Sequence, residues 1–488
     1  MLAALAVASS VLLVAAASAP ASATDSAAPA APVTTAPAAS VPADVFSRLA
    51  DPETVPYAIT GKGFVTDASH PMHPGDFRKY DVTARLSVNP ELGEAALDLT
   101  LTEKDESSTD HYYVRRGRVF QVNEKGEETA TSAYGDVSAA TLAALHPSLV
   151  ASAMLERRDA VRGAGPGHLL FAWNDEMWTV DLDVASGRIS RLERQTFNGV
   201  FGDVLEEVRY DAWPDGASLA PGRVVVTSRG REVLHLDFAP IERGIALTAF
   251  PEGNRQRDRS MAVASSDVAL QEVAPHVFTI DLAQANTRVT VAEFADHLMV
   301  IEGAYSSRLC DRIADVLRAR FHKPVRYFAF SHLHGQYVGG VRSWVEEGAT
   351  VLVPPTTAPL IDEIVKSPAT LRPDAFAKSP KPLHVETIAD RRRLEDGTNA
   401  VDVINVESGH TDEYFLFYFP KQKVLMTGDL LFFVPGKPLS GRSKLLCHTV
   451  AKLGLDVTTY YATWPLTGYS TKNVVTAEEM KAACAEAK

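Results

Sequence analysis

Hydrophobic and polar residues alternate along much of the first half of the chain. The clearest of these segments are 80–88, 95–103, 110–122, 176–184 and 222–228. Apolar side chains at every second position are typical of strands that bury one face. A stretch with helical spacing, from about 138 to 160, interrupts them. The pattern predicts a mainly antiparallel β domain with one packed helix over residues 44–260.

From about residue 268 onwards, expected strands alternate with expected helices. One helix is expected from Ser306 to Arg320, with Ser306 as its N-cap. The apolar residues on one face of this helix are Leu309, Ile313, Val316 and Leu317. A second helix is expected over 340–347, between strands at 325–331 and 349–355. This alternation predicts an α/β domain over residues 268–488.

The first 23 residues are uncharged, mostly apolar, and end in Ala21-Ser22-Ala23. This pattern predicts a secretory signal peptide over 1–23, with an N-terminal membrane anchor as the alternative. Residues 24–43 are rich in Ala and Pro and are expected to form a disordered tether. We therefore expect an exported protein, periplasmic or secreted, with no transmembrane anchor after signal cleavage.

Composition narrows the functional classes. The chain has 488 residues and a formal net charge of −13, which argues against nucleic acid as a partner because phosphate binding needs clustered Lys and Arg. Its three cysteines allow at most one disulfide. Cys310 and Cys447 lie among apolar residues of expected helices, so both are expected to be buried thiols. His448 is expected to be a packed helix residue.

Candidate chemistry gathers where strands of the α/β domain end. His332 and His334 follow the strand VRYFAFS, His410 follows VDVINV, and Asp429 follows KVLM. Three imidazoles and a carboxylate, each at a strand end, predict a metal site on one rim of a sheet. Three His ligands could hold one Zn²⁺ and leave a fourth position for water. His276, His297, His322 and His384 have no partners at ligand spacing.

These motifs resemble the metallo-β-lactamase fold superfamily over residues 268–470. The resemblance is carried by SHLHGQYVGG, SGHTDE and LMTGDLLF, which occur in this order and each follow a strand. It implies an αβ/βα sandwich of two sheets with external helices and a site along one edge. It also implies that His332, His334 and His410 are ligands of a first metal, with Asp429 as the bridging ligand.

The sequence departs from the superfamily at the ligands of the second metal. The motif HxHxDH has Gln336 in place of its Asp and Tyr337 in place of its last His, and Thr467 stands where a final His is usual. Gln336 could orient a water by hydrogen bonding but cannot act as a general base. Tyr337 could donate a hydrogen bond to a substrate oxygen. Asp429 could then act as the base, or hold His410 from behind.

Two hypotheses follow from the degenerate motif. In the first, the protein is a mono-zinc hydrolase that acts on a small-molecule ester, thioester, lactone or related substrate, with Asp429, Gln336 and Tyr337 as catalytic residues. In the second, it is a non-catalytic relative that serves as a binding or interaction module in the cell envelope. The sequence leaves the substrate, the metal and the oligomeric state open.

Overall fold

The computed structural model describes most of the chain from residue 41 onwards. The described residues are 41, 43–49, 53, 55–67, 72–92, 94–103, 106–115, 118–122, 128–129, 144–173, 176–183, 185–214, 220–246, 267–283, 285–467 and 469–485. The predicted signal peptide 1–23 and almost all of the predicted tether 24–43 lie outside them. Among the described residues, no helix is both long and apolar enough to cross a membrane.

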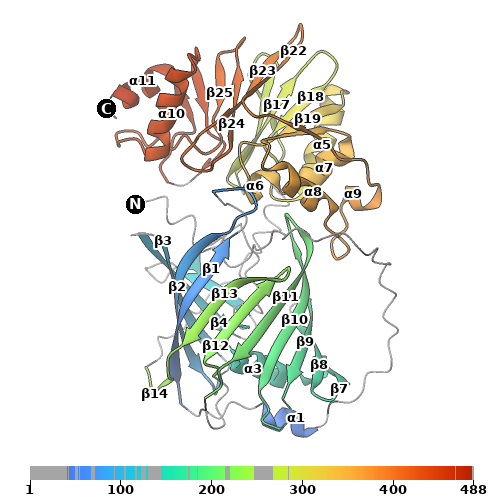
Figure 1. Ribbon diagram of the computed structural model, residues 1–488, viewed down its shortest axis with the longest axis vertical. Coiled ribbons are helices and arrows are strands. Elements are labelled where there is room, and N and C mark those ends of the chain that lie inside the picture. The colour runs from blue at the N-terminus through green and yellow to red at the C-terminus, as the bar shows by residue number, and fades with distance from the viewer. Residues whose placement is uncertain are drawn as a thin grey trace. The chain divides into compact units, whose positions relative to one another are not determined.

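The chain divides into two compact units (Figure 1). Unit 1 comprises Met1–Ala68, Phe77–Thr196 and Val204–Arg257. Unit 2 comprises Ser69–Asp76, Phe197–Asp203 and Asp258–Lys488. Two short segments from the first half of the sequence, 69–76 and 197–203, therefore belong to the second unit.

Unit 1 is built on one large antiparallel sheet. The strand order is β6-β5-β4-β3-β2-β1-β13-β12-β11-β10-β9-β8-β7, with β14 paired to β1. The strands are β1 Tyr57–Asp67, β2 Arg78–Asn89, β3 Glu94–Glu103, β4 Glu106–Arg115, β5 Arg118–Val122, β6 Glu128–Thr129, β7 Val161–Gly165, β8 His168–Trp173, β9 Glu176–Leu182, β10 Ile189–Asn198, β11 Gly202–Asp211, β12 Arg223–Ser228, β13 Arg231–Phe238 and β14 Glu242–Arg243. The strands predicted for this half of the chain are present and pair antiparallel.

The core of unit 1 lies on one face of its sheet. Along β2, Val82, Ala84, Leu86 and Val88 are buried, while the residues between them are more exposed, as the period-two pattern predicts. The helices are α1 Ala43–Arg48, α3 Pro147–Glu156 and the short 3₁₀ helix η2 Arg158–Ala160. Leu149 and Met154 of α3 join the same apolar core. The helix predicted over 138–160 corresponds to α3 and η2, and residues 138–143 lie outside the described residues.

Unit 2 contains two sheets. The first has the order β15-β16-β17-β18-β19-β20-β21, and the second β22-β23-β24-β25-β26-β27. The strands are β15 Leu270–Ala274, β16 Val277–Leu282, β17 Thr287–Glu293, β18 Leu298–Ile301, β19 Val325–Ala329, β20 Thr350–Val353, β21 His384–Thr387, β22 Arg391–Glu395, β23 Ala400–Val406, β24 Tyr414–Phe419, β25 Val424–Met426, β26 Thr459–Tyr461 and β27 Val474–Thr476. Strands β18 to β21 run parallel, as do β25 and β26.

The two sheets pack against each other and carry helices on their outer sides. Met299 and Ile301 of β18 share one core with Phe415 and Phe417 of β24. The helices are α5 Ser307–Phe321, α6 Gly335–Val338, α7 Val341–Glu347, α8 Ala358–Lys366, α9 Ala375–Lys378, α10 Gly441–Lys452 and α11 Ala477–Ala485. Helices α10 and α11 cover the other face of the second sheet. Every residue of β24 is therefore buried, because both faces of this strand are covered.

The helix α5 begins one residue after its predicted N-cap, Ser306. A close contact explains the paired glycines that follow α6. A Cβ on Gly340 would lie 2.0 Å from the Sγ of Cys310, which is buried in α5. The expectation of a buried thiol is confirmed for Cys310, whose pKa burial raises to about 12.

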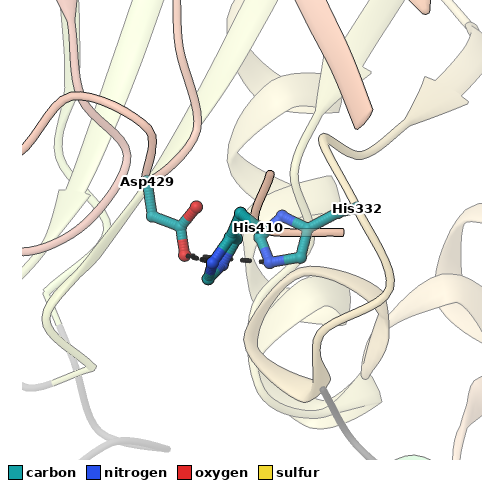
Figure 2. A group of neighbouring side chains, drawn as sticks. All are labelled: His332, His410 and Asp429. Carbon is teal, nitrogen blue, oxygen red and sulfur yellow. Dashed lines mark hydrogen bonds and ion pairs between the residues drawn. The ribbon is translucent and has the colours of Figure 1, made fainter. Parts of the chain in front are cut away.

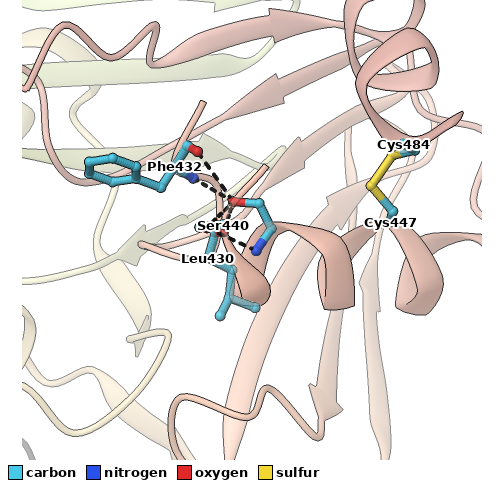
Figure 3. The surroundings of a disulfide bond; sticks show 6 residues. Leu430, Phe432, Ser440, Cys447 and Cys484 are labelled. Atoms are coloured by element: carbon cyan, nitrogen blue, oxygen red, sulfur yellow. Dashed lines mark hydrogen bonds between the residues drawn. A yellow bond between two sulfur atoms is a disulfide. The ribbon is translucent and has the colours of Figure 1, made fainter. Parts of the chain in front are cut away.

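Two predictions about the C-terminal helices are wrong. Cys447 is not a buried thiol, because it forms a disulfide with Cys484 that joins α10 to α11 (Figure 3). The two positions are 37 residues apart, so their proximity depends on how the helices pack. His448 is exposed rather than packed, since it lies on the solvent side of α10.

Candidate metal centre

The loop after β19 fixes His332. The backbone N–H of Ser331 donates to Glu302 Oε2 at 3.0 Å, and the Ser331 carbonyl accepts the N–H of Phe415 at 2.6 Å. The Ser331 hydroxyl contacts His332 Nδ1 at 3.1 Å. Because Nδ1 is engaged in this way, Nε2 is the atom that His332 turns toward Asp429.

The loop after β23 presents His410. The hydroxyl of Ser408 accepts the backbone N–H groups of His410 at 3.1 Å and Thr411 at 2.8 Å, and donates to the Thr411 carbonyl at 2.6 Å. Such a side-chain cap satisfies the polar groups of a tight loop. Ser408 is itself buried, so the loop has a defined conformation at the point where it presents the imidazole.

The turn after β25 presents Asp429, and Tyr414 of β24 holds it. The Tyr414 hydroxyl accepts the backbone N–H of Asp429 at 2.8 Å and contacts its Oδ1 at 3.0 Å. Gly428 adopts a left-handed conformation with φ of +58°. A Cβ at this position would lie 2.0 Å from the Tyr414 hydroxyl oxygen. The glycine of the GD motif therefore allows Tyr414 to reach the carboxylate.

Three of the predicted residues converge at this edge of the two sheets (Figure 2). Asp429 Oδ2 lies 3.2 Å from His410 Nε2 and 3.7 Å from His332 Nε2. One possible ligand atom from each of the three residues lies within 4.8 Å of the other two. Among the described residues, this is the one group of three or more possible ligands with such spacing.

The donor set fits one divalent metal ion. Ligand atoms about 2.1 Å from a tetrahedral zinc lie about 3.4 Å apart, which is close to the two distances to Asp429 Oδ2. Burial lowers the pKa of His332 well below its usual range, so its imidazole is neutral and its lone pair is available. Burial opposes the charge of Asp429, but His410, His332 and Arg442 together lower its pKa well below its usual range. A neutral imidazole and an ionised carboxylate are the forms that bind metal.

His334 lies beside this group but outside it. Its Nδ1 accepts the backbone N–H of Gln336 at 3.2 Å and so caps α6. The centres of the His334 and His332 rings are 5.7 Å apart. Binding a metal through Nδ1 would require His334 to give up this cap, so its role as a ligand stays a prediction.

Of the residues that replace the second-metal ligands, Tyr337 contacts the group. Gln336 is buried, and its side-chain amide donates to the Ala285 carbonyl at 3.3 Å. Tyr337 is fully buried, with its ring edge-to-face against that of His332 at 5.1 Å. Thr467 is exposed, and its N–H donates to Asn286 Oδ1 at 2.7 Å. The catalytic roles expected for Gln336 and Tyr337 stay predictions.

Several residues around the group were not singled out in the sequence. Tyr414 and Ser408 position ligands, although Tyr414 resembles an ordinary strand residue and Ser408 is part of SGHTDE without a predicted role. Glu302 is fully buried behind Ser331, and burial raises the pKa of its carboxyl to about 8. Arg442, in the first turn of α10, places its Nη1 3.9 Å from Asp429 Oδ2. Only the folded chain brings these four side chains to the site.

The segment 72–76 borders the loop that carries His410. The backbone N–H of Asp412 donates to the Met72 carbonyl at 2.9 Å, and the Asp412 carboxylate pairs with His73. All of these residues belong to unit 2. A stretch that precedes the α/β part of the sequence by about 200 residues thus contributes to the rim of the site.

Among the comparisons with known proteins, only the one with solved structures gives matches. No family model matches the chain, and no curated protein does. Solved structures that are similar to it include a metallo-β-lactamase from Pontibacter korlensis, with 14% identity, coverage of 45% of this chain and 98% of that one, and a TM-score of 0.34. The mono-zinc form of the metallo-β-lactamase FIM-1 from Pseudomonas aeruginosa shows 14% identity, coverage of 45% and 94%, and a TM-score of 0.34.

A double mutant of the sec-alkyl sulfatase PisA1 also matches, with 14% identity, coverage of 45% of this chain and 41% of that one, and a TM-score of 0.33. Unit 2 itself has two packed sheets with the motif residues in order at their strand ends. The two packed sheets and outer helices expected for this part of the chain are present in the structure.

Proposed function

We propose that the protein is a metal-dependent hydrolase with a single metal ion, held by His332, His410 and Asp429 at the edge of an αβ/βα sandwich. The convergence of these three donor atoms within 4.8 Å carries the proposal. Zinc is the proposed ion, and His334 is the nearest further imidazole. The two packed sheets with outer helices support the sandwich arrangement in unit 2.

A divalent metal at such a site supplies Lewis acidity and activates water at neutral pH. The chain's own residues supply orientation. Ser331 holds Nδ1 of His332, and Tyr414 holds Oδ1 of Asp429, so Nε2 and Oδ2 keep their positions toward the metal.

Asp429 is better suited to binding a metal than to acting as a general base. Its pKa lies well below its usual range, because His410, His332 and Arg442 offset the effect of burial. An efficient general base has a pKa near the working pH. We therefore assign Asp429 the role of a metal ligand, and a bound metal would supply the acidity that activates water. The substrate is a small molecule with an ester, thioester, lactone or related bond.

Metal content tests the site directly. Purified full-length protein should contain about one zinc per chain, measured by mass spectrometry of the metals. The variant His332→Ala/His410→Ala should lose it. A matched control, His384→Ala/His448→Ala, removes two exposed histidines of the same unit and should keep it. Equal metal content in the two double variants would contradict the proposed ligands, and iron in place of zinc would correct the ion.

A hydrolase panel tests the activity. Zinc-loaded protein should turn over at least one ester, thioester or lactone substrate, and Asp429→Asn should abolish that turnover with the fold intact. No turnover across the panel by metal-loaded protein would favour the alternative, a non-catalytic binding module in the cell envelope.

Export is part of the proposal. The Cys447–Cys484 disulfide supports it, because disulfides persist mainly in oxidising compartments outside the cytosol. The mature chain should begin at Thr24 and occur in the periplasmic or secreted fraction. N-terminal sequencing of the protein from fractionated cells checks this, and a cytosolic chain that retains residues 1–23 would refute it.

A further inference from the structure

Arg442 lies beside the candidate metal group and is held there firmly. It belongs to the first turn of α10, next to the buried residue Ser443. The Ser443 hydroxyl accepts the N–H of Phe432 and donates to the Leu430 carbonyl, both at 2.9 Å. Figure 3 shows Leu430 and Phe432 against this first turn. The turn that follows Asp429 is thus joined to the helix that carries Arg442.

The guanidinium of Arg442 is enclosed but poorly paired. Only 15% of the side-chain surface is exposed. Its one acidic partner among the described residues is Asp429, with Nη1 3.9 Å from Oδ2, which is beyond hydrogen-bond distance. No residue that the structure describes accepts a hydrogen bond from it. Five N–H donors that carry a permanent charge are therefore left for another acceptor.

Aromatic rings surround the same guanidinium. Its central carbon lies 5.4 Å from the centre of the Phe432 ring and 5.8 Å from that of Trp464. The ring of Tyr469 lies 5.4 Å from Trp464 and 5.9 Å from Phe432. Rings at this distance favour a cation and also provide an apolar surface. The site therefore places a guanidinium group and an apolar aromatic surface next to the metal ligands.

We propose that Arg442, Phe432 and Trp464 form a subsite for an organic oxyanion, a carboxylate, sulfate or phosphate group attached to an apolar body. The inference rests on the proposed function and narrows its substrate to an anionic amphiphile. A planar guanidinium pairs with two oxygens of such a head group at once. The half-buried rings of Phe432 and Tyr469 accept the apolar body, and the buried ring of Trp464 packs behind them. Arg442 also supplies a fixed positive charge beside Asp429, where the sequence lacks the ligands of a second metal.

Calorimetric binding to the full-length protein tests the subsite without any activity measurement. The probes are hexanoate, hexyl sulfate and hexyl phosphate, with acetate as the head group alone and hexanamide as the uncharged analogue. Metal-stripped and zinc-loaded protein are both titrated. We expect saturable binding of at least one hexyl anion, weaker binding of acetate, and none of hexanamide. The order among the three hexyl anions identifies the preferred head group.

Variants assign the binding to these residues. Arg442→Met should weaken the best anion by about tenfold or more, and Arg442→Lys should weaken it less, because the charge remains and the fork is lost. Phe432→Leu should weaken the hexyl anion but not acetate. Arg320→Met is the control, since Arg320 also lies over a ring, that of Phe321 at 5.2 Å, on the exposed side of α5.

Equal affinity in wild type, Arg442→Met and Arg442→Lys would overturn the inference, as would hexanamide binding as tightly as hexanoate. Should Arg442→Met fail to fold, the comparison with Arg442→Lys decides. The proposed function can fail separately. Anion binding that depends on Arg442 in a protein without metal or turnover would keep the subsite and refute the hydrolase.

Discussion

Replacing Gly428 by alanine should damage the site more than its small size suggests. The added Cβ would lie 2.0 Å from the Tyr414 hydroxyl oxygen and 2.8 Å from the side chain of Ser331. Tyr414 is fully buried and its hydroxyl binds Asp429, so it cannot move aside without breaking these hydrogen bonds. The substitution therefore combines backbone strain, overlap and lost hydrogen bonds at a single position.

The magnitude follows from these three contributions. A left-handed conformation costs an alanine about 1–2 kcal/mol relative to glycine. Overpacking in a close-packed interior costs about 1–3 kcal/mol, and a displaced hydrogen bond about 1 kcal/mol. The sum is about 3–6 kcal/mol in the free energy of unfolding. Gly436→Ala is the matched control, because Gly436 has φ of +73° and nothing within 4 Å of an added Cβ. Only the strain of about 1–2 kcal/mol applies there.

Urea unfolding of the full-length variants, followed by circular dichroism, measures the difference, and metal content measures the effect on the ligands. Gly428→Ala should be less stable than Gly436→Ala by about 2–4 kcal/mol and should bind less zinc. In a Tyr414→Phe background, which removes the nearest oxygen, part of the penalty of Gly428→Ala should disappear. Equal stability of the two alanine variants, or full additivity with Tyr414→Phe, would refute the reasoning.

Three further predictions concern other parts of the chain. Burial lowers the pKa of His146 to about 3, against about 6.5 in the unfolded chain, so stability should fall as the pH drops from 6.5 toward 3, by about 2 kcal/mol at pH 5. Urea unfolding at several pH values should show this loss in wild type and a flatter profile in His146→Asn; parallel profiles would contradict the assignment. Replacing Cys447 and Cys484 by serine should cost about 3–4 kcal/mol, given the 37-residue separation, and an unchanged melting temperature would show that the bond adds nothing. Asp203→Ala should lower the free energy of unfolding by about 2–3 kcal/mol, because the Asp203 carboxylate accepts hydrogen bonds from the N–H and the hydroxyl of Thr370, both at 2.6 Å. Calorimetry checks this, with Asp211→Ala as the control because Asp211 is exposed. Equal effects of the two substitutions would contradict the prediction.

Local pattern was sufficient to predict much of the secondary structure. The helix expected from Ser306 runs from Ser307 to Phe321, because its apolar spacing is a local signal. Ser306 occupies the N-cap position, but its side chain makes no capping hydrogen bond. The strands of unit 1 follow their period-two alternation. Strand β24 shows that alternation alone does not predict burial on both faces of a strand. Its alternating Phe415, Phe417 and Phe419 face the core between the sheets, but the residues between them are buried as well, by α10 and α11.

Motif order predicted three members of the candidate site. His332, His410 and Asp429 meet because each follows a strand of the same unit and their loops share one edge. His334 was also expected among the ligands, which stays a prediction; in the structure its Nδ1 caps α6. That outcome depends on the conformation of a four-residue helix, which spacing alone does not determine. The disulfide was missed because α10 and α11 meet only through packing.

The sequence by itself determined which residues could bind a metal and which ligands of a second metal are missing, because strand ends and residue types are written locally. It also determined that the first half of the chain favours strands and the second half alternates strands with helices. Only the tertiary structure decided that Tyr414 and Ser331 hold the ligands. It also decided that the Arg442 guanidinium lies among aromatic rings, with its Nη1 3.9 Å from Asp429 Oδ2. Ser331 adjoins His332 in the sequence, but Tyr414 and Arg442 reach Asp429 from a strand and a helix, and those distances depend on how these elements pack.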